Sequence, residues 1–167
     1  MIVLTFLIII SVVIIQRLIE LFISRKNEIW LLNNGAVEFG HSHYKTILML
    51  HILFFVSMSI EFFVSPQKNI FLIPLILILL LQIFRIRIIL SLGKFWNTKI
   101  YRIPGSQLIN TGLYKYIKHP NYIIVFLEIL ILPLIFGLYV TSILSTILNI
   151  IVLSNRIKIE NIALKSL

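Results

Sequence analysis

Long apolar runs separated by short polar segments are the dominant pattern of the sequence, and they predict membrane-spanning helices. The runs cover residues 2–24, 45–64 and 69–91, followed by an apolar stretch over residues 121–155. A helix needs roughly 20 residues to cross a bilayer core of about 30 Å, so each of the first three runs fits one crossing. The last stretch is too long for one crossing and contains Pro133 and Gly137, which suit a kink and a turn. We therefore expect a helical hairpin there, and an all-α integral membrane protein with about five transmembrane helices.

The segment between the third span and the hairpin, residues 93–120, is polar and rich in glycine and basic residues. Irregular backbone near a membrane is tolerated only where it is buried in protein or lines a water-filled cavity, and a connection of this length is usually functional. We therefore expect a single membrane domain over residues 1–167, in which residues 1–92 form three spans. Residues 93–167 would hold the functional segment, the hairpin over residues 121–155 and a short C-terminal helix in the tail, residues 156–167.

Composition supports a membrane protein and removes several kinds of chemistry. The chain is 59% hydrophobic with a mean hydropathy of +1.04, whereas soluble domains are about 45–50% apolar. It has no cysteine, which excludes disulfides, thiolate metal sites and cysteine nucleophiles, and no aspartate. His41 and His43 could supply two metal ligands at most, so we interpret them as interfacial or hydrogen-bonding histidines and expect no metal.

The net charge of +9 is explained by position and does not require a nucleic-acid partner. Basic residues gather in the loop over residues 25–45, in the segment over residues 93–120 and in the tail, while the remaining connection carries only Lys68. With five spans these three basic segments share one face of the membrane. The positive-inside rule then places the N-terminus outside, and the C-terminus and functional segment in the cytoplasm, of a membrane that we expect to be a bacterial plasma membrane.

Ionisable residues inside the predicted spans are costly and normally face other helices or a wet cavity. Arg17 and Glu20 have the spacing of an ion pair on one helix face, which would either lock helix packing or line an active cavity. Arg85 and Arg87 lie near the end of the third span and are expected to snorkel to the interface. Glu128 would either bond a polar stripe on the returning helix of the hairpin or function in the active cavity. The stripe consists of Ser142, Ser145, Thr146 and Asn149.

Familiar soluble-enzyme motifs are missing. The glycines do not form Gly-x-Gly-x-x-Gly or a P-loop, and there is no Gly-x-Ser-x-Gly nucleophile motif. A nucleotide-binding fold of the soluble type and a hydrolase of the serine type are therefore excluded.

Four blocks in the second half of the chain resemble the isoprenylcysteine carboxyl methyltransferase family of membrane enzymes. They are Leu92-Gly93-x-x-Trp96-Asn97, Gly112-x-Tyr114, Lys118-His119-Pro120-x-Tyr122 and Arg156-x-x-x-Glu160. The front half, with Gln16-Arg17-Leu18-Ile19-Glu20-Leu21, Arg25-x-Asn27-Glu28 and His43-Tyr44, is similar to the short bacterial branch, which includes alkylpyrone O-methyltransferases. The resemblance covers nearly the whole chain.

The resemblance implies that the C-terminal half binds S-adenosylmethionine without a Rossmann fold and that a lipophilic acceptor enters from the bilayer. By the family pattern, the cofactor-binding residues are Asn97, Tyr114, Lys118, His119, Pro120 and Tyr122. Arg156 and Glu160 match the Arg and Glu at the methyl-transfer centre. Their spacing of one helical turn also predicts an exposed ion pair between them. The chain departs from the pattern at Lys118, Ile124 and Asn161, where the family usually has Arg, Gly and Glu, and we do not expect a prenylated protein as the acceptor.

The sequence therefore predicts an S-adenosylmethionine-dependent O-methyltransferase that acts on a lipophilic carboxylate or enol at the membrane. Two alternatives remain open at this stage. The first is a membrane reductase of similar helical architecture that uses NADPH, and the second is a small membrane protein with no enzymatic activity.

Overall fold

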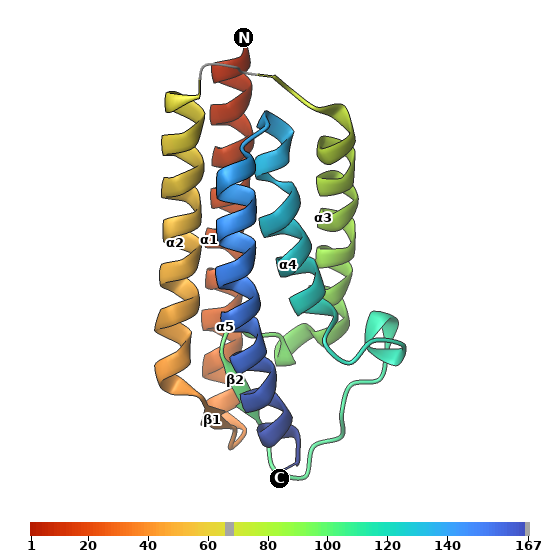
Figure 1. Cartoon of the computed structure of the whole chain (residues 1–167). Coiled ribbons are helices and arrows are strands. Elements are labelled where there is room, and N and C mark those ends of the chain that lie inside the picture. The colour runs from red at the N-terminus through yellow and green to blue at the C-terminus, as the bar shows by residue number, and fades with distance from the viewer. Residues whose placement is uncertain (66–68, 166–167) are drawn as a thin grey trace.

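The computed structural model describes residues 1–65 and 69–165 and consists of a helical bundle (Figure 1). Its helices are α1 (Ile2–Asn33), α2 (His41–Val64), α3 (Leu72–Leu92), α4 (Pro120–Ile131) and α5 (Tyr139–Lys165). Four of them are long and apolar enough to cross a membrane, and α4 adds a shorter apolar helix with the 3-10 turn η3 (Pro133–Phe136). The prediction of an all-α membrane protein is confirmed. The connection containing Lys68 lies outside the described residues.

Helix α1 is longer than the predicted span, because it continues to Asn33 where a loop was expected from residue 25. The added turns contain no glycine or proline, and their polar residues Ser24, Asn27 and Glu28 are buried against other parts of the chain. The helix therefore delivers polar side chains to the end of the bundle that carries the C-terminus, which we call the C-terminal end.

The predicted hairpin is present, but its two arms are unequal. The outgoing arm, α4, gives way to the 3-10 turn at Pro133, and Gly137 reverses the chain with a φ of 69°, a conformation that glycine adopts without strain. The returning arm, α5, runs without a break from Tyr139 to Lys165, so the tail is a continuation of this helix. Arg156 and Glu160 are consequently held on the same rigid element as the returning span.

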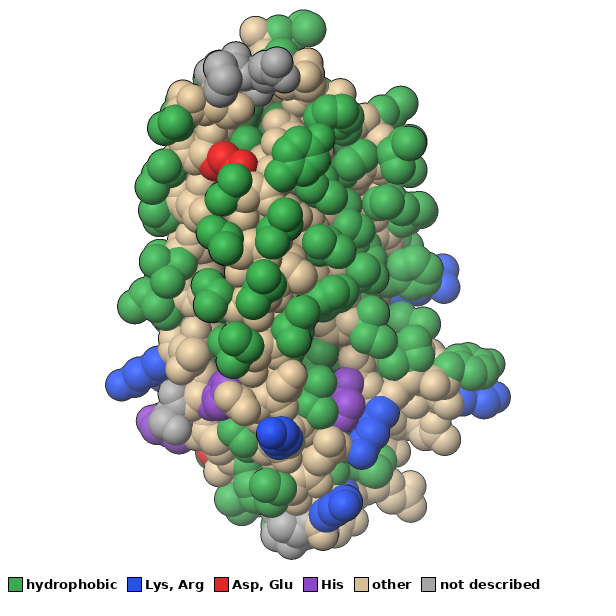
Figure 2. Space-filling view, in the orientation of Figure 1, with side chains coloured by type: hydrophobic (Ala, Val, Ile, Leu, Met, Phe, Trp, Pro, Cys, Tyr) green, Lys and Arg blue, Asp and Glu red, His purple; other side chains and the backbone are tan. Residues whose placement is uncertain are grey.

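The two halves of the bundle along its axis differ in character. Near the N-terminal end, Phe6 stacks on Phe62 with ring centroids 3.8 Å apart, and both contact the edge of Phe136. Figure 2 shows hydrophobic side chains over most of the length of one face, with most of the Lys, Arg and His side chains gathered toward the C-terminal end. This distribution suits a molecule whose flanks contact lipid and whose C-terminal end meets water.

A buried cluster of four charges joins three helices at mid-bundle. Arg17 of α1 lies 2.8 Å from Glu20 and 2.5 Å from Glu128 of α4, and Arg85 of α3 pairs with the same two carboxylates. Gln82 also donates to Glu128, at 2.9 Å. The contacts support the interpretation that Arg17 and Glu20 lock helix packing.

This cluster corrects two expectations from the sequence. Arg85 does not snorkel to the interface, because it is only 5% exposed and its guanidinium binds Glu20 and Glu128. Glu128 bonds the two arginines and Gln82 instead of the stripe on α5. The stripe makes other helix contacts, since Ser142 Oγ donates to the carbonyl of Leu130 at 2.6 Å. Sequence spacing could not show which helix lies opposite each ionisable residue.

The polar segment after α3 is partly ordered by short elements. It contains the 3-10 turns η1 (Gly93–Phe95) and η2 (Gly112–Lys115) and the strand β2 (Ile100–Arg102). Strand β2 pairs antiparallel with β1 (Val37–Phe39) from the connection between α1 and α2, with Glu38 opposite Tyr101. This small sheet was not predicted, and it fastens the polar segment to the C-terminal end of the bundle.

Candidate functional site

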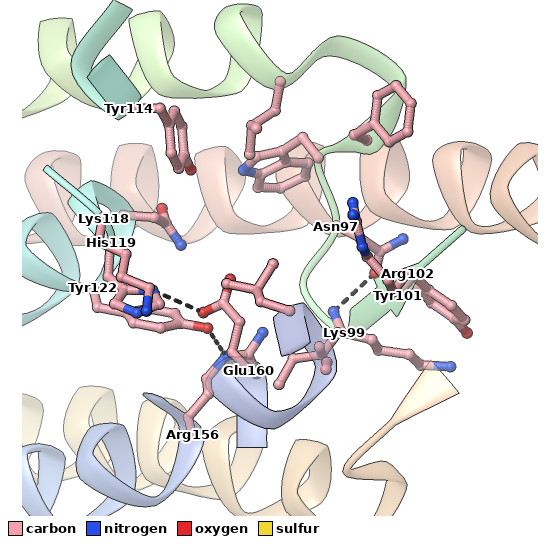
Figure 3. Close-up of a pocket in the computed structure, with 17 residues that line it drawn as sticks. Asn97, Lys99, Tyr101, Arg102, Tyr114, Lys118, His119, Tyr122, Arg156 and Glu160 are labelled. Atoms are coloured by element: carbon pink, nitrogen blue, oxygen red, sulfur yellow. Dashed lines mark hydrogen bonds and ion pairs between the residues drawn. The ribbon is translucent and has the colours of Figure 1, made fainter. Parts of the chain in front are cut away.

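A cleft opens at the C-terminal end of the bundle (Figure 3), and both apolar and polar side chains line it, as in many small-molecule sites. Its walls come from three places: the segment from Leu92 to Arg102, the stretch from Tyr114 to Tyr122, and the last turns of α5. We call it the C-terminal cleft. The lining includes the predicted site residues Asn97, Tyr114, Lys118, His119, Tyr122, Arg156 and Glu160. The structure thus brings together residues that are up to about sixty positions apart in the sequence.

Pro120 is the one predicted site residue outside the lining. It is buried at the first position of α4, where a proline is favoured because its fixed φ suits the helix and its missing N–H is not needed. His119 therefore lies just before the helix and Tyr122 lies within its first turn. Their rings stack with centroids 5.5 Å apart, so Pro120 shapes this wall without facing the cleft.

Arg156 is buried and fixed by two other segments. Its Nε donates to the hydroxyl of Tyr122 at 2.9 Å, and its Nη2 donates to the backbone carbonyl of Thr98 at 2.5 Å. The guanidinium carbon also lies 5.5 Å from the centroid of the Tyr122 ring. A guanidinium has five N–H donors, of which these two bonds use two, so Arg156 can be held in place and still bind an anion in the cleft.

Glu160 does not form the expected ion pair with Arg156. Its Oε2 lies 3.1 Å from Nδ1 of His119 (Figure 3), and Nε2 of the same histidine lies 3.3 Å from Oδ1 of Asn161. The two residues are one helical turn apart, but Arg156 is drawn toward Tyr122 and Thr98 while Glu160 faces His119. The carboxylate and the guanidinium therefore have different partners, although both line the same cleft.

Asn97 lies in the wall of the cleft, but its side-chain amide contacts helix α1. Its Nδ2 donates to the carbonyl of Ser24 at 2.9 Å, and its Oδ1 accepts from the backbone N–H of Lys99 at 2.8 Å and from the hydroxyl of Ser24 at 3.0 Å. These bonds hold the shape of the loop after η1. Ile124, at the position where the family usually has Gly, is buried in a cluster with Ile88 and Trp96 beneath this wall.

The electrostatics of the cleft favour anionic groups. Its lining contains Lys99, Arg102, Lys118 and Arg156 but only one carboxylate, that of Glu160. Of the four cations, Lys99 is partly neutralised by Glu28, whose Oε1 lies 2.7 Å from Nζ. Charge-assisted hydrogen bonds from these side chains would hold a carboxylate or an enolate.

Two further groups in the lining are suited to binding a polar ligand. Burial and the neighbouring Glu160 carboxylate raise the pKa of the Tyr114 phenol, so its hydroxyl remains a donor at neutral pH. Within residues 1–65 and 69–165, Oδ1 of Asn121 is buried without a hydrogen-bond partner. A buried acceptor of this kind normally has a partner, so a ligand donor is expected to meet it.

Sequence reasoning did not assign Lys99, Tyr101 and Arg102 to the site, although all three line the cleft. They lie on or beside β2, and only their place in the polar segment hinted at a role. Burial and hydrogen bonds to Glu28 and Glu38 raise the pKa of Tyr101. Nothing in the sequence indicated that the backbone carbonyl of Thr98 accepts a hydrogen bond from Arg156, because backbone partners cannot be identified from residue types.

The histidines His41 and His43 lie outside the cleft lining. Nδ1 of His41 lies 3.0 Å from the carboxylate of Glu38, which matches the interpretation of this residue as a hydrogen-bonding histidine. In the part of the chain that the structure describes, no three His, Asp or Glu side chains are grouped to hold a metal ion.

Comparison with known proteins identifies relatives along almost the whole chain. The model of the isoprenylcysteine carboxyl methyltransferase (ICMT) family matches residues 73–166, which contain the whole cleft lining. The uncharacterized protein YpbQ of Bacillus subtilis is 43% identical over 162 residues, which is 96% of each chain. An uncharacterized protein of Haemophilus influenzae is 29% identical over 154 residues, or 90% of each chain. No solved structure matches the chain.

Proposed function

Because the chain belongs to the isoprenylcysteine carboxyl methyltransferase family of membrane methyltransferases, we propose that it is an S-adenosylmethionine-dependent O-methyltransferase that acts on a lipophilic carboxylate or enol. The observation that carries the proposal is the position of Arg156, a buried cation fixed at the wall of a cleft at the end of a membrane bundle. Such a group can orient an anionic acceptor whose apolar part remains in the lipid.

The residues of the C-terminal cleft fit the proposed methyl donor. Tyr114, His119 and Tyr122 offer aromatic surfaces, and Lys118 and Arg102 offer cations for a carboxylate such as that of the donor's amino-acid end. The acceptor oxygen of Asn121 and the carboxylate of Glu160 could bind its ammonium or lie near its sulfonium. When bound, S-adenosylmethionine supplies an electrophilic methyl group, which is attached to a sulfonium sulfur that is a good leaving group.

The chain's own residues then have a modest chemical task. A carboxylate or an acidic enol is already anionic at neutral pH, so no strong base is needed and alignment provides most of the acceleration. Arg156 would bind and orient the acceptor anion, and the contact between His119 and Glu160 would hold the opposite wall. The reaction forms a bond between the acceptor oxygen and the methyl carbon and breaks the bond between that carbon and sulfur.

The proposed orientation places the N-terminus outside and the C-terminal cleft in the cytoplasm of a bacterial plasma membrane. It rests on the basic residues near the end of α1 and the start of α2, of the polar segment and of the tail, all of which belong to the C-terminal end of the bundle.

The test uses the purified full chain in nanodiscs. We expect calorimetry to detect binding of S-adenosylmethionine and not of NADPH. Labelled methyl should pass to a long-chain 4-hydroxy-2-pyrone or a long-chain fatty acid, and not to a neutral long-chain alcohol. Arg156→Ala should lower this transfer by about 100-fold or more, because it removes the group that orients the anion. Lys158→Ala, an exposed position on the same helix, is the matched control and should retain activity.

Three results would contradict the proposal. If Arg156→Ala transferred methyl as well as the parent chain, the role of this residue would be wrong. Binding of NADPH in place of S-adenosylmethionine would favour the membrane reductase. If neither cofactor bound and His119→Ala had no effect in cells, a protein without enzymatic activity would be the better explanation.

A further inference from the structure

One turn near the end of helix α1 holds the loop on which Arg156 depends. Ser24, Asn27 and Glu28 are 4%, 9% and 8% exposed, and all three face the segment after α3. We call these three residues the α1 brace. They overlap the Arg25-x-Asn27-Glu28 motif of the sequence, to which no role has been assigned above.

Ser24 bonds the loop at Asn97 and Thr98. Its hydroxyl lies 2.8 Å from the hydroxyl of Thr98 and accepts the backbone N–H of Thr98 at 3.0 Å. Its backbone carbonyl accepts from the side-chain amide of Asn97 at 2.9 Å. A single residue of α1 therefore fixes both the backbone and the side chain of Thr98.

Asn27 fixes the start of the same loop. Its side-chain Nδ2 donates to the carbonyl of Gly93 at 3.1 Å and to the carbonyl of Trp96 at 2.7 Å. The two carbonyls bracket the 3-10 turn η1, in which the carbonyl of Gly93 also accepts from the backbone N–H of Trp96. The amide of Asn27 thus ties both ends of this turn to α1, at the point where the chain leaves α3.

Glu28 fixes the end of the loop. Its Oε1 accepts from Nζ of Lys99 at 2.7 Å and from the hydroxyl of Tyr101 at 2.9 Å. Tyr101 in turn donates to Glu38 of β1 at 3.0 Å, so the brace and the small sheet hold the same strand. The loop from Gly93 to Tyr101 is consequently tied to α1 at its start, its middle and its end.

The middle of this loop is the point that matters for Arg156. The carbonyl of Thr98 accepts from Nη2 of Arg156 at 2.5 Å, one residue beyond the amide bonds of Asn97. A displacement of Thr98 would therefore displace the guanidinium. Reactions that depend on alignment are sensitive to such shifts, and a misplacement of about 1 Å can lower a rate by about 100-fold.

We propose that Ser24 and Asn27 are positioning residues, which set the guanidinium of Arg156 through the carbonyl of Thr98. The inference rests on the proposed function for its effect on turnover, but the contact chain itself is independent of which molecule is methylated. Neither residue lines the C-terminal cleft, so neither is a contact of cofactor or acceptor.

The experiment compares Ser24→Ala and Asn27→Ala with Lys26→Ala, an exposed control on the same turn. We expect the two brace variants to lower kcat for a long-chain 4-hydroxy-2-pyrone about tenfold, with the Kd for S-adenosylmethionine within about twofold of the parent. Arg156→Lys should lower kcat further. Adding Ser24→Ala to Arg156→Lys should have little further effect, because residues that act through one another are not additive.

A second readout does not depend on activity. The Nε–H signal of Arg156 in an arginine-labelled sample, assigned through Arg156→Lys, should shift in Ser24→Ala and remain in place in Lys26→Ala. If the parent chain transferred no methyl, the proposed function would fail while the signal would still decide the role of the brace. If the parent was active, but Ser24→Ala left both kcat and the signal unchanged, the inference would be overturned. A variant that lost its fold would be recognised by its thermal unfolding. If Asn27→Ala did not fold, Ser24→Ala, which removes only a hydroxyl, would decide the inference.

Discussion

Arg156 is useful to the proposed reaction because it is both charged and immobile. Its partners are neutral: the hydroxyl of Tyr122 at 2.9 Å and the carbonyl of Thr98 at 2.5 Å. A carboxylate partner would have cancelled its charge, whereas neutral acceptors hold its direction and leave the charge for an acceptor anion. At the scale of single residues, the neutral partners of Arg156 therefore leave its positive charge available in the cleft.

Tyr122→Phe tests this arrangement. The change removes the hydroxyl that accepts from Nε of Arg156 and leaves a buried donor without its partner, which typically costs about 1–3 kcal/mol. We expect methyl transfer to fall about tenfold, with binding of S-adenosylmethionine retained because the ring beside His119 remains. Tyr116→Phe is the control, since Tyr116 is 80% exposed. Equal activity of the two variants would show that the hydroxyl does not position Arg156.

Seven of the eight site residues predicted from motifs line the cleft, but their partners could not be predicted. Spacing along α5 suggested a pair between Arg156 and Glu160, whereas burial of Arg156 drew it to Thr98 and Tyr122 instead. Asn97 was predicted to bind the cofactor, and its amide was found against Ser24. Residue types identify which groups can bond, and the packing of distant segments decides which of them do.

At the scale of elements, the bundle is joined by charge as well as by apolar packing. Glu20 and Glu128 each contact both Arg17 and Arg85, so the cluster is neutral and links α1, α3 and α4. Charges in a membrane interior persist when they are paired in this way. Hydropathy could predict where the helices lie, but not that the polar residues within them meet.

Arg85→Leu should weaken the bundle strongly. It leaves Glu20 and Glu128 with one arginine between them, and breaking a buried ion pair from one side costs about 3–5 kcal/mol. Arg87→Leu, two positions along the same helix but exposed, should change stability by well under about 1 kcal/mol. Thermal unfolding in one detergent provides the comparison. Similar midpoints for the two variants would mean that the cluster does not stabilise the fold.

At the scale of the whole molecule, the odd number of membrane crossings decides whether the N-terminus and the C-terminus lie at the same end of the bundle or at opposite ends. Four long helices and the short α4 unit alternate in direction, so the N-terminus and the C-terminus lie at opposite ends of the bundle (Figure 1). The alternation could be predicted from hydropathy, since each of the first three apolar runs had the length of one crossing and the last was long enough for a hairpin. The small sheet could not, because its strands of three residues are too short to produce a pattern.

The absence of cysteine from the sequence makes the proposed orientation directly measurable. Asn69→Cys and Lys158→Cys each introduce one thiol at an exposed position, the first just before α3 and the second on the last turns of α5. With the C-terminal cleft in the cytoplasm, a membrane-impermeant maleimide added to bacterial spheroplasts should label Asn69→Cys at once and Lys158→Cys only after permeabilisation. The reverse pattern would place the basic end outside, against the positive-inside rule, and would separate the cleft from a cytoplasmic supply of methyl donor.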